Sequence, residues 1–379
     1  MIGPDRMPQR VSRLTPLDAV FASVDAVARP VPSRPLALAA ALGRVLAADA
    51  VVGAALPTGP LALRDGWAVR CELVADAGSH APTLLVPPPD WVDAGAPVPA
   101  PADAVVAPDA VVVRDGMAEA LGPAVPGEGV LGAQADAAAG QALRRCGEIV
   151  RAIDVAALHA AGVATVAVRV PDIRAVCLNA TIDAAADAVG PLIAGAIRRD
   201  GGCAQVRYLR DGGERALAQM LTEDDTDAVI GIGGTGMGRN DFGVRVLAQV
   251  GTVAAHGIGL IPGETAAIGS VGARPVLLLP GRLDAALAVY LVVGQHMLAG
   301  LTGRTAAEPG TNVTLTRKLV STVGMAEVAL VGKGDGGVAP LATGFFPLHA
   351  MARADGYVLV PAASEGYPAG TVVTMRALR

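Results

Sequence analysis

The sequence has few aromatic residues: Phe, Trp and Tyr make up 3% of its 379 positions, so aliphatic side chains must fill the core. Its four cysteines lie too far apart in the sequence to predict a zinc site or a disulfide framework. No apolar run of about 18 residues lacks a charge, Gly or Pro, so we expect no membrane span. The net charge of -5 gives no support for nucleic-acid binding.

The chain is long enough for two to four domains with a large buried core. Residues 1–14 are polar with scattered arginines, and we interpret them as an N-terminal leader. They lack the apolar segment of a signal peptide, so we expect a cytoplasmic protein.

The stretch with the clearest chemical signal is 227–242, which has the sequence DAVIGIGGTGMGRNDF. Its apolar start, 228–232, is typical of a strand that is buried on both faces. The dense glycines that follow let backbone N–H groups approach a ligand, most often an anion. Asp241 ends this segment, and 244–250 can form a helix behind it. We call residues 233–241 the glycine loop and expect the chemistry to take place there.

Sequence spacing alone leaves the ligand of this loop open. The G-x-G-x-x-G pattern from Gly231 matches a dinucleotide fingerprint, but no acid follows about 20 residues later to bind a ribose. Residues 233–240 nearly match a phosphate-binding loop, yet Arg-Asn replaces its Lys-[Ser/Thr] pair. A glycine-rich turn without any ligand is the third possibility.

Strands and helices alternate from residue 171 on, which predicts an α/β domain with a parallel sheet. Strands are predicted at 173–178, 205–209, 228–232 and 275–279, and helices at 184–199, 215–221 and 284–300. Ligands of such sheets bind at the carboxyl ends of the strands, where the glycine loop lies. The segments 51–124 and 306–379 show short strands and turns, so each is predicted to be β-rich.

Several short motifs follow one another in a set order. They are Ala41–Ala47 (ALGRVLA), Arg64–Val69 (RDGWAV), Ala94–Pro99 (AGAPVP), Gly127–Glu128, Gly233–Asp241 (GGxxxGxxD), Leu279–Gly281 (LPG) and Ala354–Pro361 (ADGYVLVP). In sequence and order they resemble segments of the molybdopterin molybdenumtransferase family, the gephyrin E-domain-like enzymes that insert molybdate into molybdopterin. The resemblance spans about 15–379.

The resemblance implies a multidomain α/β protomer. Its parts would be an elongated, α-rich two-segment domain (15–50 and 125–170), an inserted β-rich domain (51–124), an α/β molybdopterin-binding domain (171–305) and a small C-terminal β domain (306–379). It also implies a homodimer with Mg²⁺ as cofactor and with molybdopterin or adenylyl-molybdopterin and molybdate as ligands. A molybdoenzyme or other cofactor-synthesis proteins are further candidate partners.

The motif positions also imply site residues. The catalytic candidates are Asp65, Asp187 and Asp241, and the metal candidates are Asp65, Asp183 and Asp241. The candidates for binding the pterin and its phosphate are Gly233, Gly234, Thr235, Gly236, Gly238, Arg239, Pro280, Gly281 and Arg282. Asp65 could also be only the first residue of a turn, and Asp187 only an acid on a helix surface.

The sequence departs from the family pattern at charged positions. A Ser-Thr-Gly-Asp-Glu-Leu segment is replaced by Asn179–Ala184, which keeps only Asp183 as an acid. A Lys-Pro-Gly-Lys segment is replaced by Ile261–Glu264, which turns a cation beside an anion site into a carboxylate. Each such charge interaction is worth roughly 4 kcal/mol at about 4 Å and an effective dielectric near 20. Arg239 and Arg282 are candidates to replace the lost positive charge.

We therefore predict a molybdenum cofactor biosynthesis protein that binds molybdopterin or its adenylate and inserts molybdate. One alternative is a catalytically impaired paralogue that carries the cofactor or acts as a scaffold for molybdoenzyme maturation. The other is an enzyme of the same fold that acts on another anionic nucleotide. The altered acid and lysine motifs favour the alternatives, and the retained glycine loop and Asp241 favour ligand binding.

Overall fold

The computed structural model describes residues 9–178, 184–209, 213–305 and 310–378. The chain folds into two compact units. The first comprises Met1–Ala48, Cys146–Arg151 and Val166–Arg379, and the second comprises Asp49–Arg145 and Ala152–Thr165.

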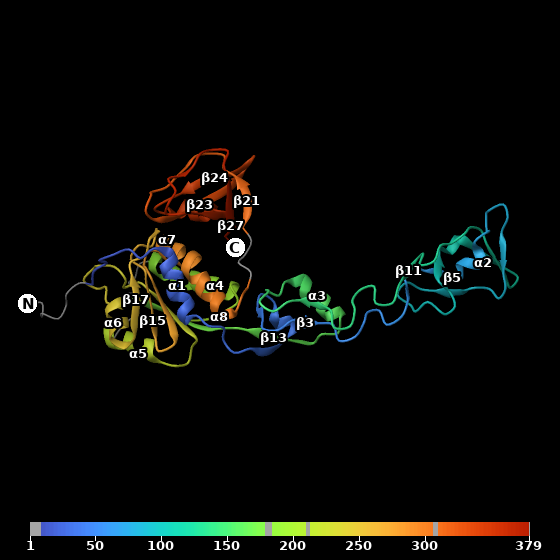
Figure 1. Cartoon of the computed structure of the whole chain (residues 1–379), viewed down its shortest axis with the longest axis horizontal. Helices are drawn as coiled ribbons and strands as arrows, with labels where there is room; N and C mark the ends of the chain where they lie inside the picture. The colour runs from blue at the N-terminus through green and yellow to red at the C-terminus, as the bar shows by residue number, and fades with distance from the viewer. Residues whose placement is uncertain (1–8, 179–183, 210–212, 306–309, 379) are drawn as a thin grey trace, which may run out of the picture. The chain divides into compact units, whose positions relative to one another are not determined.

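A six-stranded sheet in the order β15-β14-β16-β20-β19-β17 is the centre of the first unit (Figure 1). Its strands are β14 (Asp172–Leu178), β15 (Cys203–Leu209), β16 (Ala228–Ile232), β17 (Thr252–His256), β19 (Ala267–Val271) and β20 (Arg274–Leu279). The four strands from β15 to β20 are parallel, which confirms the predicted α/β class. β19 and β17 extend the sheet in antiparallel pairing, because a two-residue turn at 272–273 reverses the chain between β19 and β20.

Helices cover both faces of this sheet. They are α1 (Leu17–Val27), α4 (Ala184–Arg199), α5 (Gly213–Thr222), α6 (Gly243–Val250), α7 (Leu283–Val289) and α8 (Gln295–Thr302). Buried residues of α1, α4, α7 and α8 pack with Ile173 and Ile230 on one face, whereas α5 and α6 pack with Val176 and Val229 on the other. Because neighbouring strand residues point to opposite faces, the continuous apolar strands supply both cores.

The helix predicted for 284–300 is interrupted by a π-helical segment, Tyr290–Gly294, between α7 and α8. In the part of the chain that the structure describes, the stretch Leu283–Thr302 alone is long and apolar enough to cross a membrane. However, 78% of that window is buried inside the protein, as is usual for a core helix of a globular fold.

The remaining strands of the first unit form other sheets. The largest has five strands in one path and a sixth that branches from β23; it contains β18 (Leu260–Ile261), β21 (Thr311–Thr314), β23 (Ala326–Gly334), β24 (Gly337–Ala342), β25 (Gly356–Val360) and β27 (Val372–Ala377). The other strands are β1 (Arg34–Ala37), β2 (Val45–Leu46), β13 (Thr165–Arg169), β22 (Leu319–Val320) and β26 (Gly366–Tyr367), with α9 (Leu348–Arg353) and a 3₁₀ turn at Leu38–Ala41. The β-rich character predicted for 306–379 is thus present.

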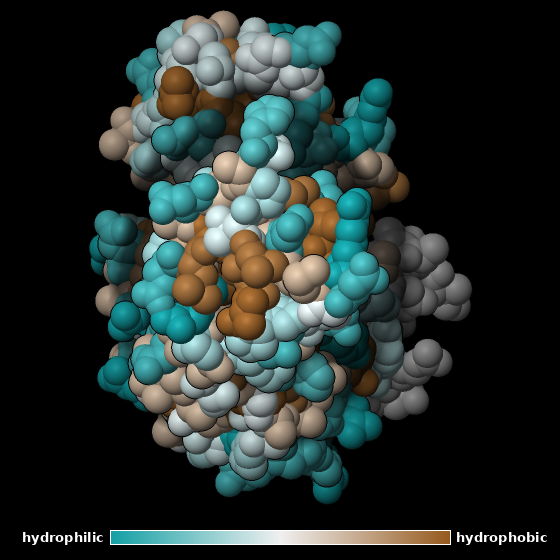
Figure 2. Space-filling model, turned by 90° about the vertical axis from the view of Figure 1, so that its right-hand side faces the viewer, coloured by the Kyte–Doolittle hydropathy of each residue, from teal (hydrophilic) through white to brown (hydrophobic). Residues whose placement is uncertain are grey.

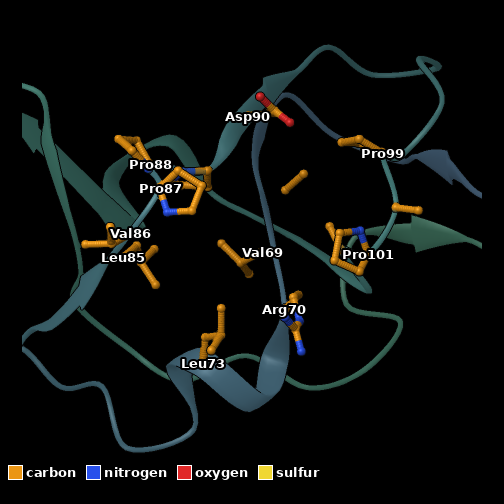
Figure 3. Close-up of a pocket in the computed structure, with 14 residues that line it drawn as sticks. Val69, Arg70, Leu73, Leu85, Val86, Pro87, Pro88, Asp90, Pro99 and Pro101 are labelled. Carbon is orange, nitrogen blue, oxygen red and sulfur yellow. The ribbon is translucent and has the colours of Figure 1, made fainter.

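The second unit consists mainly of short antiparallel strands. They are β3 (Ala50–Val51), β4 (Leu61–Ala62), β5 (Gly66–Val69), β6 (Thr83–Leu85), β7 (Asp90–Val92), β8 (Ala104–Val106), β9 (Val111–Arg114), β10 (Met117–Ala120), β11 (Val130–Leu131) and β12 (Ala142–Arg144), with α2 (Cys71–Val74), a 3₁₀ turn at Pro108–Ala110 and α3 (Ala152–Ala160). A cavity of about 220 Å³ lies beside β5 and α2, with prolines on two sides and Arg70 and Asp90 at its edge (Figure 3).

Exposed hydrophobic side chains are concentrated in the second unit. Ten of the nineteen large ones that are exposed in the described residues belong to it, although it spans only 49–145 and 152–165. Val86 is the most exposed of them, at 77%. Figure 2 shows such side chains gathered in patches on one face of the molecular surface, with hydrophilic residues around them.

Candidate functional site

The glycine loop lies where three parallel strands end. β14 ends at Leu178, β16 at Ile232 and β20 at Leu279, and the loop leaves β16 between the other two. The Gly233 N–H donates to the Leu279 carbonyl at 2.9 Å. A Cβ added to Gly281 would lie 3.4 Å from the Cα of Gly233, so β16 and the Pro280-Gly281 turn approach each other backbone to backbone. The structure therefore brings the predicted residues 233–241 and 280–282 to one sheet edge.

Two positions at the start of the loop require glycine. Gly233 has a φ of +89° and Gly234 a φ of +72°, which side chains rarely adopt. A Cβ on Gly233 would lie 3.1 Å from the Leu178 carbonyl oxygen, and one on Gly234 would lie 2.9 Å from the Leu178 side chain. The Gly234 carbonyl in turn accepts from Gly243 N at the start of α6, at 2.9 Å. The backbone is thus fixed at the place where a ligand would approach it.

Asp241 folds back into the glycine loop. Its Oδ2 accepts a hydrogen bond of 2.8 Å from the Gly238 N–H. Side chains at Gly236 or Gly238 would occupy this space, because their Cβ atoms would come within 2.7 and 2.8 Å of the same oxygen. Arg239, between these groups, is exposed. The Asp241 carboxylate is therefore held at the edge of the loop, where it can bind a cation or contact a reacting group.

A second set of contacts holds the loop from the side of β17 and β19. Thr235 is 1% exposed, and its hydroxyl lies 3.1 Å from that of Thr265. His256 Nε2 lies 3.0 Å from the Thr235 carbonyl oxygen, so the neutral ring with its proton on Nε2 would donate there. His256 therefore supports the loop backbone.

Gln9 makes a contact that the sequence analysis missed. Its Nε2 donates to the carbonyl oxygens of Gly234 and Gly236, both at 2.8 Å, and its Oε1 accepts from Arg245 N at 3.4 Å. One amide thus bridges the glycine loop and the first turn of α6. No local motif marks this residue, because the contact joins positions more than 220 residues apart.

Arg282 is already paired within the protein. Its Nε and one terminal nitrogen donate to the two carboxylate oxygens of Asp284, at 3.1 and 2.5 Å. The guanidinium carbon lies 5.4 Å from the centre of the Phe345 ring, a cation–π arrangement. The bond to Asp284 and the charges of Asp284 and Glu264 raise the pKa of Arg282, against a smaller opposing effect of burial. Asp284 is 3% exposed, and its Oδ2 also accepts from the Phe346 N–H at 3.3 Å, so Arg282 is the one of these two partners that balances its charge.

The segment that replaces the lysine motif, Ile261–Glu264, belongs to the connection between β17 and β19 at the same sheet edge. Glu264 is exposed, and its Oε2 accepts from the neighbouring Gly263 N–H at 2.9 Å. The whole chain has two lysines, Lys318 and Lys333, both beyond the α/β segment. The α/β segment itself can therefore offer cationic side chains only from arginine and histidine.

The other predicted acids are placed differently. Asp65 belongs to the second unit, where its Oδ1 accepts from the Ala94 N–H at 2.7 Å and holds the turn that precedes Gly95. Asp187 is in the first turns of α4, but its side chain is not among those described, and Asp183 lies outside the described residues. Nowhere in the described ranges do three acidic, histidine or cysteine side chains form a metal-binding group.

Comparison with known proteins identifies two parts of this chain. Residues 15–162 match the profile of the MoeA N-terminal region (domain I and II), and residues 176–300 match that of a probable molybdopterin binding domain. A putative molybdopterin biosynthesis protein of Methanocaldococcus jannaschii is 27% identical over 167 residues. That match covers 44% of this chain and 39% of the relative's length.

Solved structures agree with this assignment at the level of the fold. The molybdopterin biosynthesis MoeA protein of Pyrococcus horikoshii superposes with a TM-score of 0.81 at 21% identity, over 97% of this chain and 100% of its own. A molybdenum cofactor biosynthesis protein of Pyrococcus furiosus gives 0.62 at 19% identity, over 97% and 100% of the two chains. The two matched regions, which together span most of 15–300, place this chain in the molybdopterin molybdenumtransferase family, whose members serve molybdenum cofactor biosynthesis.

Proposed function

We propose that this protein binds molybdopterin or adenylyl-molybdopterin at the glycine loop and inserts molybdate there. The observation that supports it most is the close backbone of Gly233, Gly234 and Gly281 beside Asp241. A phosphate or pyrophosphate can approach such a backbone without meeting side chains, and the start of α6 favours negative charge. The match of 176–300 to a molybdopterin binding domain agrees with a pterin ligand.

Asp241 fits a role in holding Mg²⁺ together with the ligand's phosphates. Mg²⁺ in phosphate sites is usually bound by one or two carboxylates, water and the phosphate oxygens. The Gly238 N–H engages one oxygen of Asp241, so the carboxylate is oriented before any ion arrives. The ion would neutralise phosphate charge and polarise the bond to be broken. Asp65, Asp183 and Asp187 remain candidate acids from the sequence motifs.

Molybdate insertion also requires positive charge. Arg239 is exposed on the loop and is the proposed oxyanion ligand, because Arg282 is paired with Asp284. The test is reconstitution of a cofactor-free molybdoenzyme with purified protein, adenylyl-molybdopterin, Mg²⁺ and molybdate. We expect activity in the wild type and a rise of about 10- to 150-fold in the molybdate requirement of Arg239→Ala, as for the loss of a charged hydrogen bond. Arg215→Ala, which alters an exposed arginine of α5, is a matched control.

A cofactor carrier is the second candidate function, and the charges around Glu264 favour it. Glu264 places a carboxylate at the sheet edge where an oxyanion would bind, and the nearby Arg282 is occupied. A carrier would bind the pterin ligand in calorimetry and give no turnover in reconstitution. If the protein neither binds the pterin ligand in calorimetry nor supports reconstitution, both proposed functions are contradicted.

We also propose a homodimer. The exposed hydrophobic side chains of the second unit offer a surface that association can bury, and symmetric dimers are the commonest oligomers. Light scattering should then give twice the chain mass of 37.8 kDa at micromolar concentration. A monomer mass there would contradict the proposal.

A further inference from the structure

A cavity of about 220 Å³ in the first unit lies on the other edge of the main sheet from the glycine loop. Arg199 and Asp200, at the end of α4, line it, and the chain then enters β15 at Cys203. The cavity is therefore at the amino ends of the parallel strands, whereas the glycine loop follows the carboxyl end of β16. A ligand of this cavity would therefore be distinct from a ligand of the glycine loop.

Positive charge predominates in the lining of this cavity. Three arginines, Arg151, Arg199 and Arg304, line it together with one acid, Asp200. Arg304 and Gln295 also line a neighbouring cavity of about 230 Å³, together with Arg376. Arg304 is half-buried, and its charge acts on the Asp200 carboxylate. A guanidinium in this state suits an anion that binds in the cavity.

The wall of the cavity contains a buried polar cluster. Asp200 is 9% exposed, and its Oδ2 accepts from the Tyr290 hydroxyl at 2.8 Å and from Gln295 Nε2 at 3.3 Å. Burial raises the pKa of Asp200, and the bonds from Tyr290 and Gln295 and the charges of Arg199 and Arg304 oppose that shift. Burying a carboxylate costs free energy that an apolar residue would not cost. Packing alone therefore does not explain Asp200.

The π-helical segment is what brings Tyr290 and Gln295 to the same carboxylate. These residues are five positions apart, and the Gln295 N–H bonds to the Tyr290 carbonyl in the wider turn. In a regular α-helix, neighbours on one face are three or four positions apart. Gly294 makes room for this arrangement, since a Cβ there would come 2.6 Å from the Tyr290 ring. Single π turns inside α-helices occur frequently at functional sites.

We propose that this cavity is a second binding site, which holds the phosphate group of a small phosphomonoester. The three arginines would bind the phosphate oxygens, and Asp200 with Gln295 would bind a hydroxyl group of the same molecule. The volume favours a small molecule, because pockets for drug-sized ligands usually hold about 300–1,000 Å³. This site is independent of the function proposed for the glycine loop.

Calorimetric titration of the full chain with inorganic phosphate tests the proposal. We expect saturable binding in the wild type and an affinity about 10- to 100-fold lower in Arg304→Gln. Arg198→Gln is the control, because Arg198 precedes Arg199 in the same helical turn, is exposed and does not line the cavity. Arg199→Gln is a second variant in case Arg304→Gln lowers the folded fraction.

Two outcomes would overturn the proposal. One is the absence of phosphate binding to the folded wild type, which would leave Arg199 and Arg304 only their favourable position at the C-termini of α4 and α8. The other is an equal loss of affinity in Arg304→Gln and Arg198→Gln. The Gly234→Val variant separates the two sites: it should lose pterin binding and keep the phosphate binding that Arg304→Gln removes.

Discussion

The glycine loop and the segment Ile261–Glu264 lie at the same sheet edge, but they would offer an anion different chemistry. The loop acts through its backbone, which contacts from Leu279, Gly243, His256 and Gln9 hold in place. The neighbouring segment acts through side chains, and there Ile and Glu stand where the family has lysines. Side-chain charge can change by one substitution while the backbone stays fixed. Under the proposed function, substitutions should therefore separate binding of the pterin from binding of the oxyanion.

Gly234→Val should have the largest effect. It places a β-branched side chain at a φ of +72° and 2.9 Å from Leu178, so the loop must shift. We expect a loss of about 100-fold or more in pterin-ligand affinity, measured by calorimetry. Gly272→Val is the matched control: it also has a positive φ, but a Cβ there meets no atom within 4 Å. Equal losses in both variants would show that the loop is not the site.

Restoring positive charge should have the next largest effect, in the direction of gained function. Ile261→Lys combined with Glu264→Lys would exchange a repulsion for two attractions beside the loop. If the wild type is a carrier, reconstitution activity should appear or rise by about 10- to 150-fold. Glu264→Gln, which removes only the repulsion, should give a smaller gain. Unchanged pterin affinity together with no gain would mean that this segment does not face the oxyanion.

Arg282→Ala should reduce stability more than activity. Asp284 is 3% exposed in the native protein, and the substitution removes the bidentate partner of its carboxylate. We expect a loss of roughly 1–3 kcal/mol in the free energy of unfolding, measured by urea denaturation. Adding Asp284→Asn to the Arg282→Ala variant should recover much of the lost free energy of unfolding, because no buried charge then remains. A larger effect on molybdate use than on stability would instead identify Arg282 as an oxyanion ligand.

Gln9→Ala should have the smallest effect of the four. It removes hydrogen bonds to the carbonyls of Gly234 and Gly236, worth about 0.5–1.5 kcal/mol each. We expect faster amide exchange in the glycine loop and a pterin affinity lowered by less than about tenfold. Gln134→Ala, in the second unit, is the control. No change in exchange would show that the loop holds its conformation without Gln9.

The sequence allowed the loop and its sheet edge to be predicted because their signals are local. Glycines with positive φ, an acid at the loop's end and apolar strands appear as patterns within a few residues. The added strands β17 and β19 were not predicted, since the turn at 272–273 has no strong hairpin signature. Gln9, Thr265 and the Arg282–Asp284 pair also escaped prediction. Their roles arise from tertiary contacts, which no spacing rule encodes.

The contact of Gln9 also offers a way to observe the loop in solution. Ser12 is exposed and lies three residues after Gln9, on a segment that continues to the backbone bridge between Thr15 and Ile258. A fluorescent dye attached through Ser12→Cys would lie three residues from the Gln9 contact without replacing any loop residue. Cys146, which is exposed, would first be changed to Ser to make the labelling selective. Emission from such a dye would then report ligand arrival in real time, even for ligands that undergo no reaction.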